Sequence, residues 1–161
     1  MFFLYQNNSL TNSNYSYIIL NMNYTQEKKQ IFIEKCKEHN LKITQQRQAI
    51  FFELIEDKTH PSAQTVYNRI KEQFPNISFD TVNRTLLSFV DIGLLEVIPV
   101  RGKAKRFDST TREHGHFNCI KCHKLIDVTF QDGELKTPKS LQGNVVLNKK
   151  VIFEGICKDC K

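Results

Sequence analysis

Apolar residues recur at helical spacing between residues 26 and 92, and small capping residues separate the runs. This pattern predicts four helices: residues 26–40, residues 45–57, a third from Ser62 to the residue before Pro75, and residues 79–92. Thr44, Ser62 and Ser78 precede helices, where a hydroxyl oxygen can accept a backbone N–H, and Gly93 suits the positive φ of a helix end. The third and fourth helices, joined by a short turn, form the skeleton of a helix-turn-helix.

After Gly93 the pattern changes to short runs of strand-forming residues. Strands at 94–100 and 105–108 predict a hairpin that serves as a wing. Further strands are expected at 116–119, 124–130, 144–147 and 151–156, and the polar stretch 131–143 has room for a short helix limited by Pro138. The fold class is therefore α+β, with a winged helix-turn-helix domain (26–108), a hinge (109–113) and a small α/β domain (114–161). Residues 1–25 carry no charge and are expected to be a disordered tail.

The chain has 161 residues, with 23 Lys and Arg against 17 Asp and Glu, for a formal charge of +6. This balance is compatible with a polyanionic partner but does not establish one. Four of the cations lie in the wing turn, where they could follow a phosphate backbone: Arg101, Lys103, Lys105 and Arg106. No apolar run is long enough to cross a membrane, so no membrane partner is expected.

Four of the five cysteines form two Cys-x-x-Cys pairs, Cys119 with Cys122 and Cys157 with Cys160. Two such pairs match a structural Zn²⁺ site and indicate a reducing compartment, so a cytoplasmic location is expected. A redox dithiol pair and an iron–sulfur cluster remain alternatives. Cys36 lies at helical spacing from Phe32 and is expected to be a small buried hydrophobe.

His114 and His116 lie just before the first cysteine pair, and on a strand they point to the same side. They suggest a second metal, for which Asp108, Asp127 and His60 are candidate additional ligands. Imidazole combined with carboxylate favours Fe²⁺, Mn²⁺ or Zn²⁺ over a metal that prefers thiolates. Such a site would join both predicted domains, so its occupancy could control DNA binding.

Several segments together resemble the ferric uptake regulator family, and within it the peroxide-sensing branch. They are Thr44-Gln45-Gln46-Arg47, His60-Pro61-Ser62, the run from Ile77 to Leu86, Gly93-Leu94, and the His114 to Cys122 stretch with Cys157 and Cys160. The resemblance implies a repressor, not an enzyme, that binds double-stranded operator DNA as a homodimer through its C-terminal dimerisation domain. It also implies structural Zn²⁺ on the cysteines and a regulatory Fe²⁺ or Mn²⁺ on His60, Asp108, His114, His116 and Asp127. Peroxide would act at the iron and oxidise His60 or His114.

The resemblance also assigns DNA contacts, at Arg47, Ser78, Thr81, Asn83 and Arg84. Asn83 departs from the tyrosine that the family carries there, and Asn can read adenine in the major groove. Iron-sensing members tend to have Glu at the position of Asp127, and zinc-sensing members often have Cys at that of Asp108, so both residues favour the peroxide branch. The stretch 131–143 is shorter than the family's dimerisation helix.

Three alternatives remain open. An iron, manganese or zinc uptake regulator of the same family could use the same ligands, because ligand type predicts metal specificity poorly. A mononuclear non-haem iron enzyme needs only two histidines and a carboxylate, but would not account for a helix-turn-helix. A zinc-bound interaction module would leave His60, Asp108 and Asp127 without a role.

Overall fold

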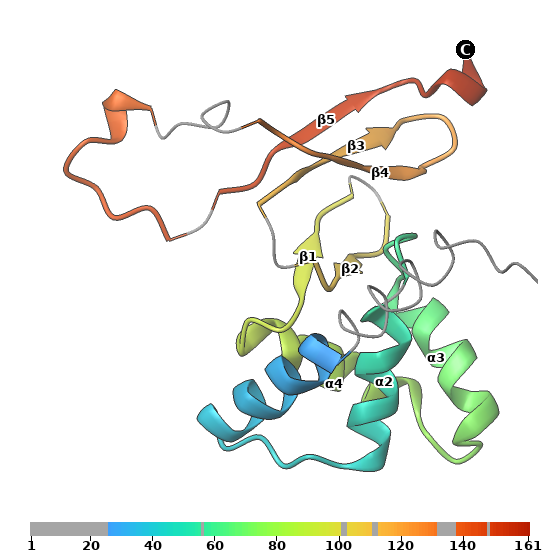
Figure 1. Cartoon of the computed structure of the whole chain (residues 1–161). Coiled ribbons are helices and arrows are strands. Elements are labelled where there is room, and N and C mark those ends of the chain that lie inside the picture. The colour runs from blue at the N-terminus through green and yellow to red at the C-terminus, as the bar shows by residue number, and fades with distance from the viewer. Residues whose placement is uncertain (1–25, 56, 101–102, 111–112, 132–137, 148) are drawn as a thin grey trace, which may run out of the picture. The chain divides into compact units, whose positions relative to one another are not determined.

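The computed structural model describes residues 26–55, 57–100, 103–110, 113–131, 138–147 and 149–161 (Figure 1). The expected tail at 1–25 lies outside this part of the chain. The fold divides into two compact units, Met1–Ile43 and Thr44–Lys161. In the first unit a helix covers residues 26–38 and buries Phe32 and Cys36, as its periodicity predicted. Asn40 follows this helix with φ 53°, in the left-handed region that asparagine tolerates.

The second unit begins with three helices whose starts match the predicted caps: α2 (Gln45–Ile55), α3 (Ala63–Gln73) and α4 (Phe79–Asp91). The Thr44 hydroxyl accepts the Arg47 amide at 3.2 Å, and Ser62 and Ser78 accept the amides of Thr65 and Thr81. Helix α4 ends before Gly93, which has φ 73°. These local hydrogen bonds explain why the helix boundaries could be read from the sequence.

The three helices pack through apolar stripes, and α3 and α4 form the predicted helix-turn-helix. Phe51 of α2 meets Phe89 of α4 edge to face, with ring centroids 5.9 Å apart. Val66, Val82 and Leu86 are fully buried beside them. Val90 was expected in this stripe but is only half-buried, whereas the helix buries Thr85 instead.

The wing is a short antiparallel hairpin of β1 (Glu96–Ile98) and β2 (Arg106–Asp108), shorter than the predicted strands. Part of its turn, residues 101–102, lies outside the described residues. The segment before α3 also pairs with β2: Ser62 forms a bridge with Arg106, and the Phe107 amide donates to the Pro61 carbonyl at 3.0 Å. The hairpin lies between the helices and the sheet of this unit (Figure 1).

The sheet has three strands in the order β4-β3-β5: β3 (Gly115–Cys119), β4 (Leu125–Val128) and β5 (Ile152–Gly155). Strand β3 pairs antiparallel with β4 and parallel with β5. The strand predicted at 144–147 is wrong, because these residues are irregular and join no ladder. Val145 and Leu147 are 85% and 93% exposed, so the side chains of this short apolar run are not buried. The short helix expected within 131–143 appears as a single 3-10 turn, Lys139–Leu141, while 132–137 are not described.

An apolar cluster joins the wing to the sheet, formed by Ile98, Val100 and Leu125 with Ile152 packed against it. Gly115 opens β3 where no side chain fits, since an added Cβ would lie 2.9 Å from the Val151 carbonyl oxygen and 2.8 Å from the Phe130 ring. In the described part of the chain, no helix is long and apolar enough to cross a membrane.

Candidate metal sites

The four cysteines of the two Cys-x-x-Cys pairs come together at the ends of the sheet. Cys119 ends β3 and Cys122 lies in the turn after it. Cys157 precedes the 3-10 turn η2 (Lys158–Cys160) after β5, and Cys160 is the last residue of that turn. Their sulfur atoms all lie within 4.8 Å of one another, and Cys122 Sγ and Cys157 Sγ are 3.7 Å apart. Sulfurs at about 2.3 Å from one tetrahedral ion are separated by roughly 3.8 Å. The cluster therefore has the dimensions of a Zn²⁺ site.

The surroundings of these thiols favour the thiolate form of Cys119 and oppose that of Cys160. Backbone amides of Cys122 and Cys157 lower the pKa of Cys119 to about 6, and the Cys157 amide donates to its sulfur at 3.3 Å. The neighbouring thiols of Cys122 and Cys157 raise the pKa of Cys160 to about 12. Four thiolates can share this space only with a cation among them, which is the requirement that a bound dication would meet.

Of the five predicted ligands, His60, Asp108, His114 and His116 form a second cluster, whose ligand atoms all lie within 4.8 Å of one another, and Asp127 contacts two of them. His60 precedes α3, Asp108 ends β2, His114 precedes β3, His116 lies within β3 and Asp127 lies opposite it on β4. The cross-strand pairing of His116 with Asp127 places both at the same point of the sheet, and the antiparallel wing brings Asp108 to them.

The Nε2 atoms of all three histidines lie near Asp108, and those of His60 and His116 also lie near Asp127. Asp108 Oδ2 lies 2.8 Å from His114 Nε2, 3.4 Å from His116 Nε2 and 3.8 Å from His60 Nε2. Asp127 Oδ1 lies 2.8 Å from His60 Nε2 and 3.8 Å from His116 Nε2. The Nε2 atoms of His114 and His116 are themselves 3.0 Å apart. Four ligand atoms thus surround one small volume, and Asp127 Oδ1 lies next to it, beside His60.

This arrangement fits a metal ion better than a hydrogen-bond network. Asp108 Oδ2 is buried, and it makes no hydrogen bond of acceptable geometry within the described residues although three imidazoles surround it. Adjacent ligand atoms at about 2.1 Å from a common ion lie roughly 3 Å apart, close to the shorter separations here. Nitrogen and carboxylate oxygen together suit Fe²⁺, Mn²⁺ or Zn²⁺.

The protonation states are also those of ligands. Burial lowers the pKa of His60, which keeps its imidazole neutral although Asp108 and Asp127 oppose the shift. Burial alone would raise the pKa of Asp108, but contact with His116 and the Thr110 amide outweighs it and leaves that pKa well below its usual range. The Thr110 amide donates to Asp108 Oδ1 at 2.8 Å, which also fixes the carboxylate. A neutral imidazole beside an ionised carboxylate is ready to bind a cation.

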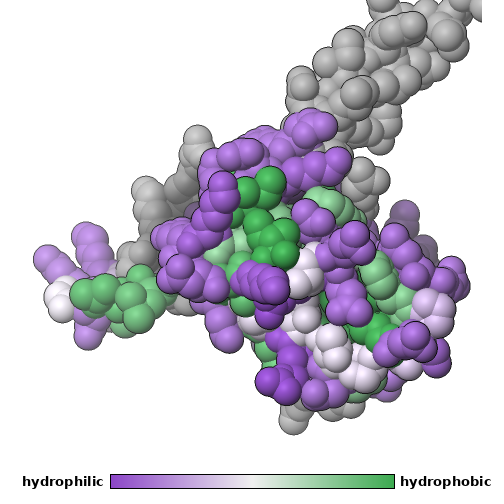
Figure 2. Space-filling view, turned by 90° about the horizontal axis from the view of Figure 1, so that it is seen from below, coloured by the Kyte–Doolittle hydropathy of each residue, from purple (hydrophilic) through white to green (hydrophobic). Residues whose placement is uncertain are grey.

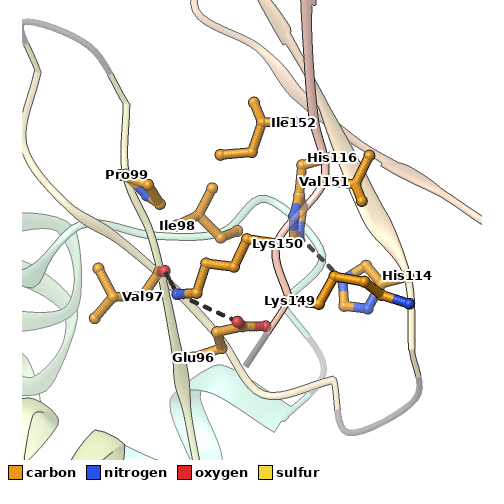
Figure 3. Close-up of a pocket in the computed structure, with 10 residues that line it drawn as sticks. All are labelled: Glu96, Val97, Ile98, Pro99, His114, His116, Lys149, Lys150, Val151 and Ile152. Atoms are coloured by element: carbon orange, nitrogen blue, oxygen red, sulfur yellow. Dashed lines mark hydrogen bonds and ion pairs between the residues drawn. The ribbon is translucent and has the colours of Figure 1, made fainter. Parts of the chain in front are cut away.

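A surface pocket reaches two of these ligands from the side of β1 and the start of β5 (Figure 3). His114 and His116 line it, while Lys150 extends across it to the Val97 carbonyl at 2.6 Å and to Glu96 at 3.2 Å. The side chains of His60 and Asp108 are only 2% and 4% exposed, whereas that of Asp127 is 33% exposed. His60 and Asp108 are therefore enclosed, whereas Asp127 on β4 is partly open to solvent.

The residues expected to contact DNA lie on α2 and α4. Ser78 and Thr81 use their hydroxyls on each other, 2.9 Å apart, as part of the α4 cap. The Arg84 side chain is 78% exposed and only loosely paired with Asp80, at 3.7 Å. Asn83 and Arg47 are half-buried. The Arg84 side chain is thus more accessible to a partner than those of Asn83 and Arg47.

Sequence reasoning placed Arg106 with the phosphate-binding cations of the wing, but the structure gives it another contact. Its guanidinium donates to the His60 carbonyl oxygen at 3.2 Å. The support of Asp108 by Thr110 and the reach of Lys150 to the wing were also missed. An Asp two residues before a Thr is a turn signal that could have indicated the contact between Asp108 and Thr110. No local signal indicates the contacts of Arg106 and Lys150.

The chain is similar to known proteins over most of its length. A family model described as the ferric uptake regulator family matches residues 38–151. The peroxide-responsive repressor PerR of Staphylococcus saprophyticus is 35% identical over 133 residues, covering 80% of this chain and 88% of that protein. PerR of Staphylococcus epidermidis is also 35% identical over 133 residues, with 80% and 87% coverage.

Solved structures show the same fold. The Campylobacter jejuni peroxide stress regulator is 31% identical, with a TM-score of 0.62 over 80% of this chain and 98% of that one. The Helicobacter pylori ferric uptake regulator Fur, at 22% identity, has a TM-score of 0.69 over 84% and 92%. The match to the family model over most of the chain, together with these relatives, shows that the chain belongs to the ferric uptake regulator family of metal-responsive transcription regulators.

Proposed function

We propose that this chain is a metal-dependent DNA-binding repressor that senses peroxide through oxidation of its ligand histidines. The observation that carries the proposal is the convergence of three imidazole Nε2 atoms on Asp108, with Asp127 beside two of them. In this proposal the regulatory Fe²⁺ or Mn²⁺ is held by His60, Asp108, His114, His116 and Asp127. Structural Zn²⁺ is held by Cys119, Cys122, Cys157 and Cys160. The names of the staphylococcal relatives support the peroxide response.

The positions of His60, His114 and Asp108 suit this proposed role. Bound Fe²⁺ would supply the electron that reduces peroxide and produces an oxidant beside the imidazoles. His60 and His114 each have Nε2 2.8 Å from a carboxylate oxygen, so both rings are held at the place where that oxidant forms. Burial of His60 and Asp108 keeps bulk water and diffusing reductants from their side of the centre. Damage to a ligand would therefore release the metal rather than lead to turnover.

DNA binding is assigned to α4 and the wing. We place the contacts at Arg47, Ser78, Thr81, Asn83 and Arg84, with Lys103 and Lys105 of the wing turn exposed for phosphate. The face in Figure 2 is largely hydrophilic, with apolar residues gathered in smaller patches. A polar surface and a net charge of +6 suit a polyanionic duplex better than an apolar partner.

The proposed domains are a winged-helix domain at 26–108, a hinge at 109–113 and a dimerisation domain at 114–161. The metal ligands come from both sides of this hinge, so loading would fix one domain against the other. Exposed apolar residues of the second domain support a homodimer, since a second copy would cover them. They include Ile126, Val145, Leu147 and Phe153.

The test is the metal dependence of DNA affinity. A duplex selected by the Mn²⁺-loaded protein from a pool of random sequences serves as the probe, and fluorescence anisotropy measures its affinity. We expect tight binding with Mn²⁺, and a loss of at least about 100-fold after a chelator that spares the zinc, because an unfilled site no longer joins the domains. Arg84→Ala should weaken binding at every Mn²⁺ concentration, whereas Asp91→Ala, at the opposite end of α4, should not. Equal affinity with and without Mn²⁺ would contradict the proposal.

A further inference from the structure

The backbone of His60 is in a conformation that few residues adopt. Its φ is 52°, in the left-handed region, although its side chain is a candidate metal ligand and is buried. Non-glycine residues occur there uncommonly, and such a conformation persists only where the surroundings hold it. Because φ sets the direction of the side chain, whatever holds this conformation also aims the imidazole.

The ring of His60 lacks the support that a metal-binding histidine usually has. Such a histidine normally donates its second ring N–H to a carboxylate or carbonyl, which orients the ring. The Nδ1 atom of His60 is buried and has no hydrogen-bond partner among the residues that the structure describes. The ring contacts Asp127 and the His116 ring through its other side, so on the Nδ1 side its orientation depends on the main chain.

The main chain around His60 is held by strand β2 of the wing. The Arg106 guanidinium donates to the His60 carbonyl oxygen at 3.2 Å, and the Phe107 amide donates to the next carbonyl, that of Pro61, at 3.0 Å. Ser62 then forms a bridge with Arg106 and caps α3. Of the contacts between β2 and this segment, only the one from Arg106 to the His60 carbonyl comes from a side chain that a substitution can remove without changing the backbone.

We infer that Arg106 is a positioning residue for the metal centre, which holds the left-handed backbone of His60 so that its Nε2 faces Asp108 and Asp127. This inference rests on the proposed function and goes beyond it. It assigns Arg106 a role in supporting the metal ligand His60 in place of phosphate binding in the wing. The coupling is reciprocal: metal bound by His60 and by Asp108, two residues after Arg106, also fixes β2 of the DNA-binding wing.

Two variants separate the two roles of a wing cation. Arg106→Met keeps an apolar stem but removes the donors, and the matched control Lys105→Met removes the adjacent, exposed cation. In the zinc-containing full chain, competition with a chelating dye should show Mn²⁺ affinity about 10–100-fold weaker for Arg106→Met, the usual cost of losing outer-shell support. Lys105→Met should bind Mn²⁺ normally. Arg106→Gln, which retains a neutral N–H donor, should recover part of the loss.

Two further readouts identify the cause. With Co²⁺ as the probe, the visible absorption of Arg106→Met should shift toward that of His60→Ala, which a general loss of stability would not produce. Saturating Mn²⁺ should restore DNA binding to Arg106→Met but not to Lys105→Met, because only the first defect lies in metal affinity.

Normal Mn²⁺ affinity in Arg106→Met, with DNA binding that saturating Mn²⁺ does not restore, would overturn the inference and return Arg106 to the phosphate contacts. If Arg106→Met does not fold, Arg106→Gln decides: DNA binding that remains weak at saturating Mn²⁺ overturns the inference, and full recovery supports it. Failure of the wild-type chain to bind Mn²⁺, or of His60→Ala to weaken it, would overturn the proposed function and this inference together.

Discussion

Replacing Cys119 with serine is expected to release the zinc and unfold the sheet β4-β3-β5. Cys119 is fully buried, its sulfur accepts the Cys157 amide, and its cluster joins the ends of β3 and β5. Structural zinc contributes an apparent 10–16 kcal/mol in zinc-finger peptides, roughly as much as the whole stability of a small domain, about 5–15 kcal/mol. A sheet with Phe153 and Ile126 exposed buries too little apolar surface to replace that contribution.

Zinc content by atomic emission, far-UV circular dichroism and limited proteolysis measure this result. The helical signal should largely remain, because α2, α3 and α4 contain none of the cysteines of the cluster, while residues after 114 become protease-sensitive. Cys36→Ala is the matched control, since Cys36 is buried in the first helix and outside the cluster. A Cys119→Ser protein that keeps zinc and a protected sheet would show that the cluster is not the structural site.

Asp108→Asn is expected to abolish Mn²⁺ binding at concentrations that saturate the wild-type chain, and metal-dependent DNA binding with it. Asp108 Oδ2 is the atom on which all three histidines converge, at 2.8, 3.4 and 3.8 Å. The amide is nearly isosteric but removes the buried negative charge that offsets a dication. Since loss of an outer-shell partner costs about 10–100-fold in metal affinity, loss of this ligand should exceed about 100-fold.

Titration calorimetry with Mn²⁺ gives the affinity, and zinc content shows whether the structural site survives. Asp159→Asn is the matched control, because Asp159 lies beside the cysteines, is 57% exposed and pairs with Lys124 at 3.4 Å. It should bind Mn²⁺ as the wild type does. Asp108→Asn with unchanged Mn²⁺ affinity would remove the His/Asp cluster from the account, even if zinc binding were unaffected.

The helices could be predicted because their signals are local. Ser62 and Ser78 accept amides three residues ahead, and Gly93 has the positive φ expected of it. Strand 144–147 could not be excluded in the same way, because a short apolar run shows which residues could form a strand but not whether a neighbouring strand will pair with them. No residue near Val145 in the sequence indicates that a pairing strand is missing.

The sequence predicted which residues form the candidate site, but not which hydrogen bonds hold them in place. His114 and His116 indicated a metal by their spacing, and residue type with family resemblance brought in His60, Asp108 and Asp127, which the fold places together. The contact of Arg106 with His60 could not be predicted, because this hydrogen bond reaches a carbonyl 46 residues earlier in the chain. Contacts between side chains and distant main-chain atoms leave no periodic or spacing signal.

Peptide mass spectrometry of the peroxide-treated protein tests the central claim most directly. The full chain, with its zinc retained, is loaded with Fe²⁺ or with Mn²⁺ and given a small excess of hydrogen peroxide before digestion. The account predicts one added oxygen on the peptide containing His60 or His114 in the Fe²⁺ sample, loss of the iron, and no change in the Mn²⁺ sample. Intact histidines with iron still bound would contradict peroxide sensing and favour a metal-uptake regulator built on the same ligands.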